Sequence, residues 1–436
     1  MSGFWKKVGI GLIFFLAAGT NLCLAQHDYI DITNPSLKKI PIVIPLIRTA
    51  PAGETSVSVK AADQFAHHLG FTGYFKVLDR KPFTGLETDE LTLDFGKWTA
   101  GGAELLVTGN IVIADGLAEV EFRLFDTFKE QLLIGKRYKG WVKDMPRIVR
   151  RFCSEIVHHL TGNWGIFDTQ IAFVSTGTGT KEIYLCDFDG SNSRRFTRNN
   201  SIALSPAWSS DAKWIAYTSF ARGRPDLYIR NISGKSGAVV SKKGINTTPA
   251  WVPGKFMLAA TLSFSGDQDI YLLSGQGKMV RKLTKKWSID TSPSWSPDGK
   301  QFAFVSNRSG SPQIYMKNTG SGRVERITFQ GRYNTQPAWS PRGDQIAYSA
   351  MERGGEINIH VIDLKTMRSA RLTYSAGKNE SPAWSPDGSL IAFSSTREGG
   401  NSRIYIMTAF GTEQRRLMRL PGQQSDPAWS PRIGNP

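Results

Sequence analysis

The sequence predicts a mainly β protein in which a C-terminal six-bladed β-propeller follows a smaller N-terminal α/β domain. A Pro-x-Trp segment occurs six times, and its tryptophans are 43 to 45 residues apart. Short β-like runs follow every copy but the last, separated by Gly, Asp, Asn and Pro, the residues that favour turns. Self-similarity at such a period is typical of repeat architectures. The six tryptophans are Trp208, Trp251, Trp295, Trp339, Trp384 and Trp429.

Each repeat contains four short strand-like segments. The Pro-x-Trp segment is followed by an apolar triplet such as Phe302-Ala303-Phe304, then by a run with an aromatic residue such as Tyr315. An Arg-Leu-Thr-like run such as Arg326-Ile327-Thr328 completes the repeat. A four-stranded antiparallel unit of this kind cannot bury both of its faces alone. Radial stacking against its neighbours covers both faces, which makes it a propeller blade.

The ends of the repeat region indicate how the ring closes. The first triplet, Ile171-Ala172-Phe173, has no Pro-x-Trp segment before it, and the last such segment, residues 427–429, has no triplet after it. We expect the two ends to share one blade, because this pairing removes an open sheet edge. The predicted propeller covers residues 169–431, with a short tail over 432–436.

The Pro-Asp-Gly sequence after two of the tryptophans has a simple explanation as a turn. In Pro297-Asp298-Gly299, proline fixes φ, aspartate caps the turn locally and glycine accepts a positive φ. We favour this explanation over a cation site built from the repeated aspartates. The repeated tryptophan is expected to fill the core between blades.

Residues 26–162 have a different pattern and predict an α/β domain. Ile40 to Ile47 is typical of a buried strand, and the spacing of apolar residues from Ala61 to Leu69 predicts a helix that ends at Gly70. Further strands are expected over 105–107, 118–125 and 132–138. A second amphipathic helix is expected from Asp144 to Gly162, and residues 163–168 are expected to link it to the propeller.

Residues 1–25 are typical of a signal peptide. Lys6 and Lys7 precede an apolar stretch from Val8 to Ala18 that is too short to span a bilayer, and Cys23-Leu24-Ala25 suits cleavage before Gln26. An uncleaved anchor and a lipoprotein acylated at Cys23 are the alternatives. In the mature chain Cys153 and Cys186 fall in different predicted elements, so we expect buried, unpaired thiols.

The charge balance suggests acidic partners without identifying one. The chain carries 54 Lys and Arg against 37 Asp and Glu, a formal net charge of +17. Such a balance suits nucleic acid, anionic lipid or acidic protein surfaces. The basic residues are scattered, however, and no run of five occurs. We therefore expect a basic solvated surface and no nucleic-acid partner.

No motif in the chain predicts catalysis or a bound cofactor. Gly-x-Ser-x-Gly, His-Glu-x-x-His and Cys-x-x-Cys are all absent from the sequence. The pairs His67-His68 and His158-His159 lie in predicted helices, where adjacent residues point to different faces, so neither pair makes a bidentate metal site. We expect no enzymatic activity, no cofactor and no metal.

The polar residues just before each Pro-x-Trp segment are the candidate partner-binding residues. They vary between repeats while the surrounding sequence is constant, and they would ring one mouth of the propeller channel. Loops on a rigid scaffold often carry function, although an ordinary solvated loop is the alternative. The candidates are Thr247, Thr248, Asp290, Thr291, Ser292, Asn334, Thr335, Gln336, Glu380, Ser381, Ser425 and Asp426.

The chain resembles the TolB family of the bacterial Tol-Pal system. The resemblance rests on the signal peptide, on Ile40-Pro41-Ile42-Val43-Ile44-Pro45 at the start of the α/β domain, and on six Pro-Ala-Trp-Ser-Pro-Asp-Gly-type repeats. It implies a periplasmic protein that supports outer-membrane integrity and constriction of the outer membrane at cell division.

The same resemblance implies two protein partners. The lipoprotein Pal would bind at the propeller mouth, a site that group A colicins exploit, and TolA would bind the segment after the signal peptide. That segment contains His27, Asp28, Tyr29, Ile30, Asp31 and Ile32.

Two other functions use a similar propeller. A propeller-containing peptidase would need a hydrolase domain with a nucleophile elbow. A sugar- or metal-binding propeller would need clustered acids or aromatic residues on the innermost strands, where Glu380 and Asp426 are the main candidates.

Overall fold

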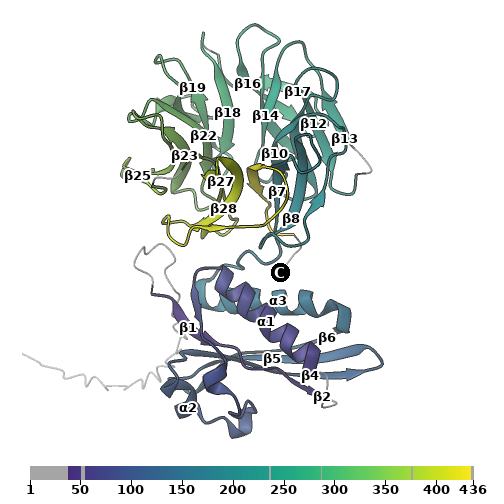
Figure 1. Ribbon diagram of the computed structural model, residues 1–436. Helices are drawn as coiled ribbons and strands as arrows, with labels where there is room; N and C mark the ends of the chain where they lie inside the picture. The colour runs from purple at the N-terminus through teal and green to yellow at the C-terminus, as the bar shows by residue number, and fades with distance from the viewer. Residues whose placement is uncertain (1–37, 51–54, 235–236, 286, 375–376, 434–436) are drawn as a thin grey trace, which may run out of the picture.

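The computed structural model describes residues 38–50, 55–234, 237–285, 287–374 and 377–433. They form an α/β domain and a β-propeller (Figure 1). The predicted signal peptide and the segment His27–Ile32 lie outside the described residues. No helix in the described part of the chain is long and apolar enough to cross a membrane.

One mixed sheet forms the α/β domain, with strand order β3-β1-β4-β5-β6 and β2 paired to β4. β1 is parallel to β3 and β4, whereas β4, β5 and β6 form an antiparallel meander. The strands are β1 (Ile40–Val43), β2 (Arg48–Ala50), β3 (Phe75–Val77), β4 (Leu105–Ala114), β5 (Leu117–Asp126) and β6 (Gln131–Trp141).

Two long helices cover the face of this sheet that points toward the propeller (Figure 1). They are α1 (Thr55–Phe71) and α3 (Met145–Thr161), and Gly162 ends α3 with a φ of 74° and a bond from its amide to the His158 carbonyl. The short α2 (Phe95–Ala100) covers the other face. Three 3₁₀ turns complete the domain, η1 (Lys81–Phe83), η2 (Glu90–Thr92) and η3 (Val142–Asp144).

The predicted helices and the three later strands are confirmed, and one predicted strand is corrected. Residues 40–47 do not form one strand, because β1 ends at Val43 and β2 begins at Arg48. Pro45 lies between them and lacks the N–H that a sheet ladder needs.

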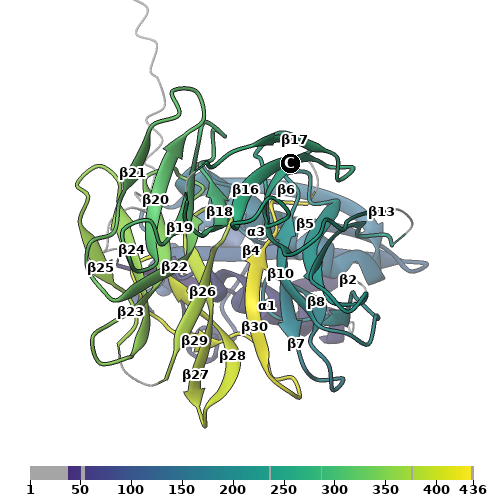
Figure 2. The ribbon, with the colours of Figure 1, turned by 90° about the horizontal axis from the view of Figure 1, so that it is seen from above.

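The propeller consists of six four-stranded antiparallel sheets, as predicted. Figure 2 looks along the channel from the side opposite the α/β domain, with the blades arranged around it. The innermost strands are β10 (Ala203–Trp208), β14 (Asn246–Trp251), β18 (Asp290–Trp295), β22 (Tyr333–Trp339), β26 (Asn379–Trp384) and β30 (Gln424–Trp429).

The remaining strands of each blade run outward in sequence order. The second strands are β11 (Trp214–Ser219), β15 (Met257–Leu262), β19 (Gln301–Ser306), β23 (Gln345–Met351), β27 (Leu390–Glu398) and β7 (Gln170–Ser175). The third strands are β12 (Asp226–Asn231), β16 (Asp269–Ser274), β20 (Gln313–Asn318), β24 (Ile357–Asp363), β28 (Asn401–Thr408) and β8 (Glu182–Asp187). The outermost are β13 (Gly237–Val240), β17 (Met279–Lys282), β21 (Val324–Arg326), β25 (Ser369–Arg371), β29 (Arg415–Arg416) and β9 (Arg194–Arg195).

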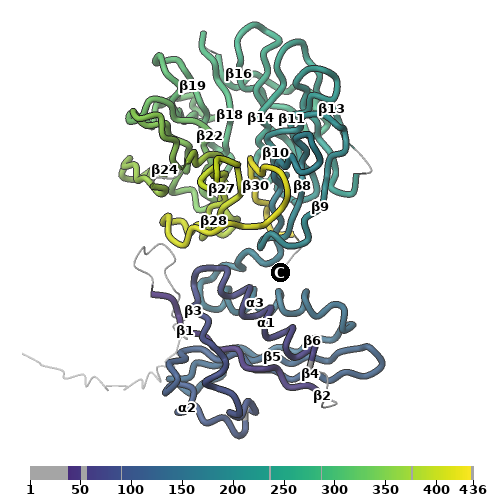
Figure 3. Tube along the Cα trace, viewed as in Figure 1, coloured from purple at the N-terminus to yellow at the C-terminus, as the bar shows by residue number. Residues whose placement is uncertain are grey.

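The C-terminal strand closes the ring, which confirms the prediction from the repeat ends. β30 pairs antiparallel with β7, so the last Pro-x-Trp segment and the first apolar triplet belong to one blade. The Ser430 hydroxyl accepts a hydrogen bond from the backbone amide of Gln170 at 2.9 Å. The backbone amide of Ser430 donates to the backbone carbonyl of Gln170 at 2.8 Å. The tube in Figure 3 shows this C-terminal segment beside the start of the propeller.

The repeated tryptophans join neighbouring blades. All six are buried, and four donate an indole hydrogen bond to the alanine carbonyl of the preceding Pro-x-Trp segment. Trp384, for example, donates to the Ala338 carbonyl at 3.0 Å. The other three such bonds are Trp208 to Ala428, Trp251 to Ala207 and Trp295 to Ala250, at 3.0, 3.1 and 3.3 Å.

The two exceptions have local causes. Trp339 follows the one repeat with serine in place of alanine, and the Ser294 hydroxyl accepts the Trp339 backbone amide at 2.9 Å while the indole donates to the Gly343 carbonyl. Trp429 lies in the closing blade, where its indole donates to the Thr169 hydroxyl at 2.8 Å.

The Ser-Pro-Asp-Gly segments are turns held by their own side chains. The Ser296 hydroxyl donates to the Asp298 carboxylate at 2.6 Å and accepts from the backbone amide of Gln301. Gly299 has a φ of 66°. These bonds confirm the turn interpretation of the repeated aspartate.

The two domains share one hydrophobic cluster. Phe65 and Leu69 of α1 belong to the same buried group as Phe167, Phe188 and Trp429. Polar contacts flank it, because Arg415 donates to the Phe71 carbonyl and Lys39 pairs with Glu413 at 2.5 Å. The α/β domain is therefore packed on the closing blade and on the blade before it.

The two cysteines of the predicted mature chain are buried, as expected. Cys153 lies in α3 and Cys186 in β8, and both thiols are free. Burial raises the thiol pKa of each well above its usual value, so neither is a reactive thiolate.

Removal of β30 is expected to open the ring and destabilise the protein. Deleting residues 423–436 exposes β7 as an edge and removes Trp429, whose burial alone is worth about 3–5 kcal/mol by comparison with other large-to-small changes. We expect a fall in Tm of about 10 °C or more by calorimetry. Deletion of residues 434–436 alone is the control, and an unchanged Tm in the longer deletion would contradict the closure argument.

Candidate protein-binding mouth of the propeller

One face of the propeller is covered by the α/β domain, and the opposite face carries the candidate site. The covered face has turns that contact the α/β domain. Asp189, between β8 and β9, pairs with His67 of α1, and Glu413, between β28 and β29, pairs with Lys39 just before β1. Innermost strands end on this face and begin on the other. The start of an innermost strand is bonded to the preceding blade. For example, the Asp290 backbone amide donates to the Gln268 backbone carbonyl at 2.8 Å. We call the channel opening on the uncovered face the distal mouth.

The residue just before each repeated proline lines the channel at the distal mouth. Six such residues and their prolines enclose a cavity of 180 Å³, and a second cavity of 560 Å³ follows on the side of the α/β domain. The six residues are Ser205, Thr248, Ser292, Gln336, Ser381 and Asp426.

These six residues have an unusual backbone conformation. Their φ angles lie between 46° and 57°, in the left-handed region that non-glycine residues seldom occupy. Each lies at a shift in the register of the innermost strand, as between Thr291 and Ser294. A β-bulge re-aims a side chain, and here it directs the side chain into the channel. Repetition of this strained conformation in all six blades indicates that the fold imposes it.

Hydrogen bonds connect several of these side chains around the channel. The Gln336 amide donates to the Ser381 hydroxyl at 2.8 Å, and that hydroxyl donates to the Asp426 carboxylate at 3.1 Å. On the other side, the Ser292 amide donates to the Thr248 hydroxyl at 3.3 Å. The bonds run from one blade to the next, so the polar lining is prearranged rather than free to move.

The two acids predicted at the mouth differ in environment. Burial raises the pKa of Asp426, and the hydrogen bond from Ser381 offsets part of this effect. Burial also raises the pKa of Glu380, which Lys378 lowers and Asp426 raises further. Asp426 is the one acid among the residues that line the distal cavity, so the structure does not assemble a ring of acids for a cation there.

The other predicted residues divide into two groups. Thr247, Thr291, Thr335, Glu380 and Ser425 are half-buried beside the channel-lining residues and remain available at the surface. Asp290 and Asn334 are fully buried, which corrects their assignment as contact residues. Asp290 accepts two hydrogen bonds from Arg308 at 2.8 and 3.0 Å, and Asn334 donates to Gln313 at 2.7 Å, so both hold the start of a strand.

An exposed aromatic rim around the distal mouth was missed by the sequence analysis. Trp287 is 96% exposed, Phe329 71% and Tyr374 69%, and all three lie in loops that lead from an outermost strand to the next innermost strand. The signal was present, because Phe329 and Tyr374 directly follow the threonine of an Arg-x-Thr run. Arg326 and Arg371 lie 5.0 and 4.9 Å from these rings.

Basic side chains accompany the aromatic rim. Arg332 and Arg353 line a hollow of 630 Å³ together with Phe329, and Lys285 and Lys378 are exposed in neighbouring loops. The distal mouth is therefore a polar channel surrounded by aromatic and cationic groups. Large exposed apolar residues grouped within a polar surface mark interaction sites.

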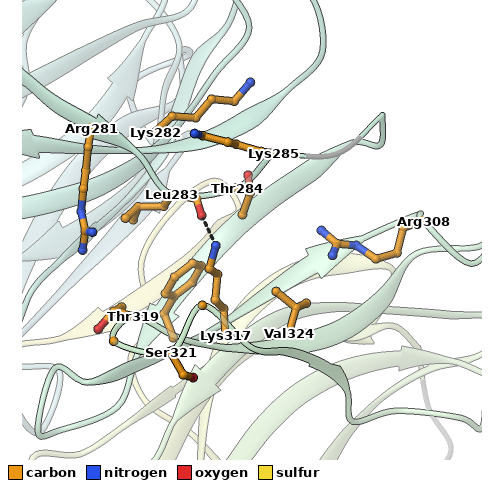
Figure 4. Close-up of a pocket in the computed structure, with 13 residues that line it drawn as sticks. Arg281, Lys282, Leu283, Thr284, Lys285, Arg308, Lys317, Thr319, Ser321 and Val324 are labelled. Atoms are coloured by element: carbon orange, nitrogen blue, oxygen red, sulfur yellow. Dashed lines mark hydrogen bonds between the residues drawn. The ribbon is translucent and has the colours of Figure 1, made fainter.

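A second basic hollow lies between two blades, outside the channel. Its volume is 460 Å³, and Figure 4 shows Arg281, Lys285, Arg308 and Lys317 around it. Lys317 donates to the Leu283 carbonyl at 2.6 Å, and burial together with the charges of Arg308 and Arg281 lowers its pKa. The hollow is outside the sequence-predicted site.

Replacement of Asp426 by asparagine is expected to stabilise the protein at neutral pH. Burial in the folded state raises the pKa of the Asp426 carboxyl. Its contribution to the free energy of unfolding is therefore greatest below the unfolded-state pKa of about 3.9, and this contribution is lost as pH rises through the folded-state pKa. The introduced amide oxygen can still accept from Ser381. We expect D426N to gain about 1 kcal/mol at pH 7, with the gain shrinking toward pH 4, in denaturant unfolding.

The matched control is Asp298→Asn in an exposed turn. Hydrogen bonds from Ser296 and Lys300 lower the pKa of Asp298, so its substitution should not stabilise the protein at pH 7. Equal unfolding midpoints for D426N and the parent chain at pH 7 would contradict this account of the channel.

Comparison with known proteins agrees with this architecture. A model described as the TolB beta propeller domain matches residues 157–433, and one described as the TolB amino-terminal domain matches residues 28–133. The crystal structure of TolB from Acinetobacter baumannii is similar with a TM-score of 0.80 and 29% identity, covering 90% of this chain and 97% of that one.

Curated sequences give the same result. The Tol-Pal system protein TolB of Desulfosudis oleivorans is 55% identical over 271 residues, which are 60% of this chain and 61% of the relative. The TolB homolog of Chlorobaculum tepidum is 41% identical over 259 residues, 59% of each chain. The matched stretch thus spans about three fifths of the length of these two relatives. Because the propeller model alone matches more than half of the chain, this protein belongs to the TolB family.

Proposed function

We propose that this protein is a periplasmic interaction component of the Tol-Pal system, which binds Pal through the distal mouth and TolA through residues 26–33. In this role it supports outer-membrane integrity and outer-membrane constriction during cell division. The observation that carries the proposal is the distal mouth. In this member of the TolB family, the mouth is a prearranged polar surface that the α/β domain leaves uncovered.

The chemistry of the distal mouth suits a protein partner. Aromatic side chains such as Trp287 supply large contact area, and interface hot spots are enriched in Trp, Tyr and Arg. The fixed hydroxyls and amides of Thr248, Gln336 and Ser381 can bond a partner's backbone at the channel entrance. Neither group resembles a catalytic set, so binding is the simpler use.

The charges of this surface favour a partner of mixed or acidic character. Arg332, Arg353, Lys285 and Lys378 surround the mouth, whereas Glu380 and Asp426 lie toward its centre. A partner segment with acids at its edge and a donor at its tip would complement this arrangement.

The division of labour between domains is part of the proposal. Residues 169–431 would bind Pal, and residues 26–162 would contribute the TolA-binding segment at their start. The predicted signal peptide over residues 1–25 supports a periplasmic location.

Substitution in the aromatic rim is expected to weaken Pal binding without unfolding the propeller. Trp287→Ala removes a side chain that is 96% exposed, so the folded state loses little packing. We expect about a 30-fold rise in Kd for Pal by calorimetry, the size of a hot-spot effect of about 2 kcal/mol, with an unchanged Tm. The triple variant of Thr291, Thr335 and Glu380 to alanine tests the inner part of the mouth.

Phe128→Ala is the matched control, because Phe128 is an aromatic residue 66% exposed on the α/β domain. Pal affinity that is the same in the parent chain, W287A and the triple variant would move the Pal site away from the distal mouth.

Deletion of residues 26–33 is expected to abolish TolA binding. The first described strand begins at Ile40, so the deletion leaves every described element in place. Pull-down and calorimetry with TolA should detect no complex, while Tm and Pal affinity stay near those of the parent chain. Normal TolA affinity in the deleted protein would refute the assignment.

A further inference from the structure

We propose that His67, His68 and Asp189 form a binding site for a zinc-like divalent transition metal, which fastens helix α1 to the turn between β8 and β9. The site joins the two domains, lies on the face opposite the distal mouth and is independent of the proposed function.

The three residues present their ligand atoms to one another. One ligand atom from each lies within 4.8 Å of the others. His67 Nε2 is 3.1 Å from Asp189 Oδ2, while the second carboxylate oxygen, Oδ1, accepts from the Ser191 amide and hydroxyl at 3.0 and 2.5 Å. These bonds fix the carboxylate so that Oδ2 faces the imidazoles.

The environment of His68 supplies an independent observation. This side chain is only 6% exposed, and both of its ring nitrogens lack a hydrogen-bond partner among the described residues. Its ring packs edge-on against Phe188 at 5.2 Å and near Phe167 at 6.2 Å. Buried polar groups are nearly always paired, and an unpaired one calls for a water or an ion. Coordination through one nitrogen would pair that atom.

The ligand set selects the class of metal. Two imidazoles and a carboxylate form a common zinc set that leaves a fourth position for water. Calcium and magnesium prefer oxygen ligands, so this set disfavours them.

The geometry requires a modest adjustment. Donor atoms around a tetrahedral zinc ion are about 3.3 Å apart, given bonds of about 2.0 Å. His67 has a side chain that is 56% exposed, so its ring has room to turn toward the ion. Arg150 is the nearby cation that opposes metal binding, and Asp187 pairs with it at 4.0 Å.

Helical spacing by itself disfavours a metal site at His67-His68, as predicted from the sequence. The third group comes from the other domain, 122 residues further along the chain. Both imidazoles have to reach the same ion, and their ligand atoms lie within 4.8 Å of each other and of a carboxylate oxygen of Asp189.

The test uses the untagged full chain after treatment with a chelator, titrated with Zn²⁺ in a calorimeter. We expect one equivalent to bind and Tm to rise. Co²⁺ in place of Zn²⁺ should give the strong visible absorption of a four- or five-coordinate ion with nitrogen ligands. Each of His67→Gln, His68→Phe and Asp189→Asn should weaken Zn²⁺ binding at least about tenfold, no less than the loss of an outer-shell partner.

Two design features keep the result decisive. His68→Phe preserves the aromatic packing and His67→Gln changes an exposed side chain, so at least one variant should remain folded by circular dichroism. His158→Phe is the matched control, because the His158 ring stacks on Trp164 at 3.9 Å and also has a buried nitrogen without a partner, but it is outside the three-residue group.

Two results would overturn the proposal. The first is a parent chain that binds no stoichiometric Zn²⁺. The second is Zn²⁺ binding of equal affinity in the parent, H68F and D189N chains, which would place the ion elsewhere.

Discussion

The indole hydrogen bond between blades is the interaction on which the propeller depends. A blade is a small sheet with two apolar faces, and only the next blade can cover them. The Pro-x-Trp segment provides that contact at the narrow inner end, where the tryptophan is buried and its N–H reaches the carbonyl of the neighbouring segment, as from Trp384 to Ala338. An indole placed there without an acceptor would lose part of the benefit of burial. At four of the six blade junctions, neighbouring blades are therefore held by the same donor and acceptor.

The same segment shapes the channel. Because the proline after each bulge has no N–H, the innermost strand cannot complete its ladder there, and the preceding residue turns its side chain toward the axis. Serine, threonine, glutamine and aspartate occupy this position in different blades, while the backbone conformation is the same. The scaffold is thus constant and the surface chemistry is free to vary, which is the arrangement that a recognition surface requires.

The sequence predicted what repetition controls. Six tryptophans at a constant spacing gave the number of blades, and the incomplete repeats at 171–173 and 427–429 gave the closure. Features that depend on contacts particular to one blade or one domain junction could not be predicted from the repeats. The burial of Asp290 depends on Arg308 18 residues away in the same blade, and the position of His67 depends on a turn of the other domain. The split of residues 40–47 follows from Pro45, a local signal that the hydrophobicity of the segment concealed.

Ring closure by the last strand also has a consequence for the order of assembly. β7 is made before its partner β30, and the two are about 250 residues apart in the chain. A chain synthesised from its N-terminus has to hold an incomplete first blade until β30 has been made. Contacts this distant in sequence slow folding and leave a strand edge exposed meanwhile. Trp429 also belongs to the cluster that seats α1 and α3, so the junction of the two domains is completed at the same late moment. The single strand β30 therefore completes both the closed ring and the junction of the two domains.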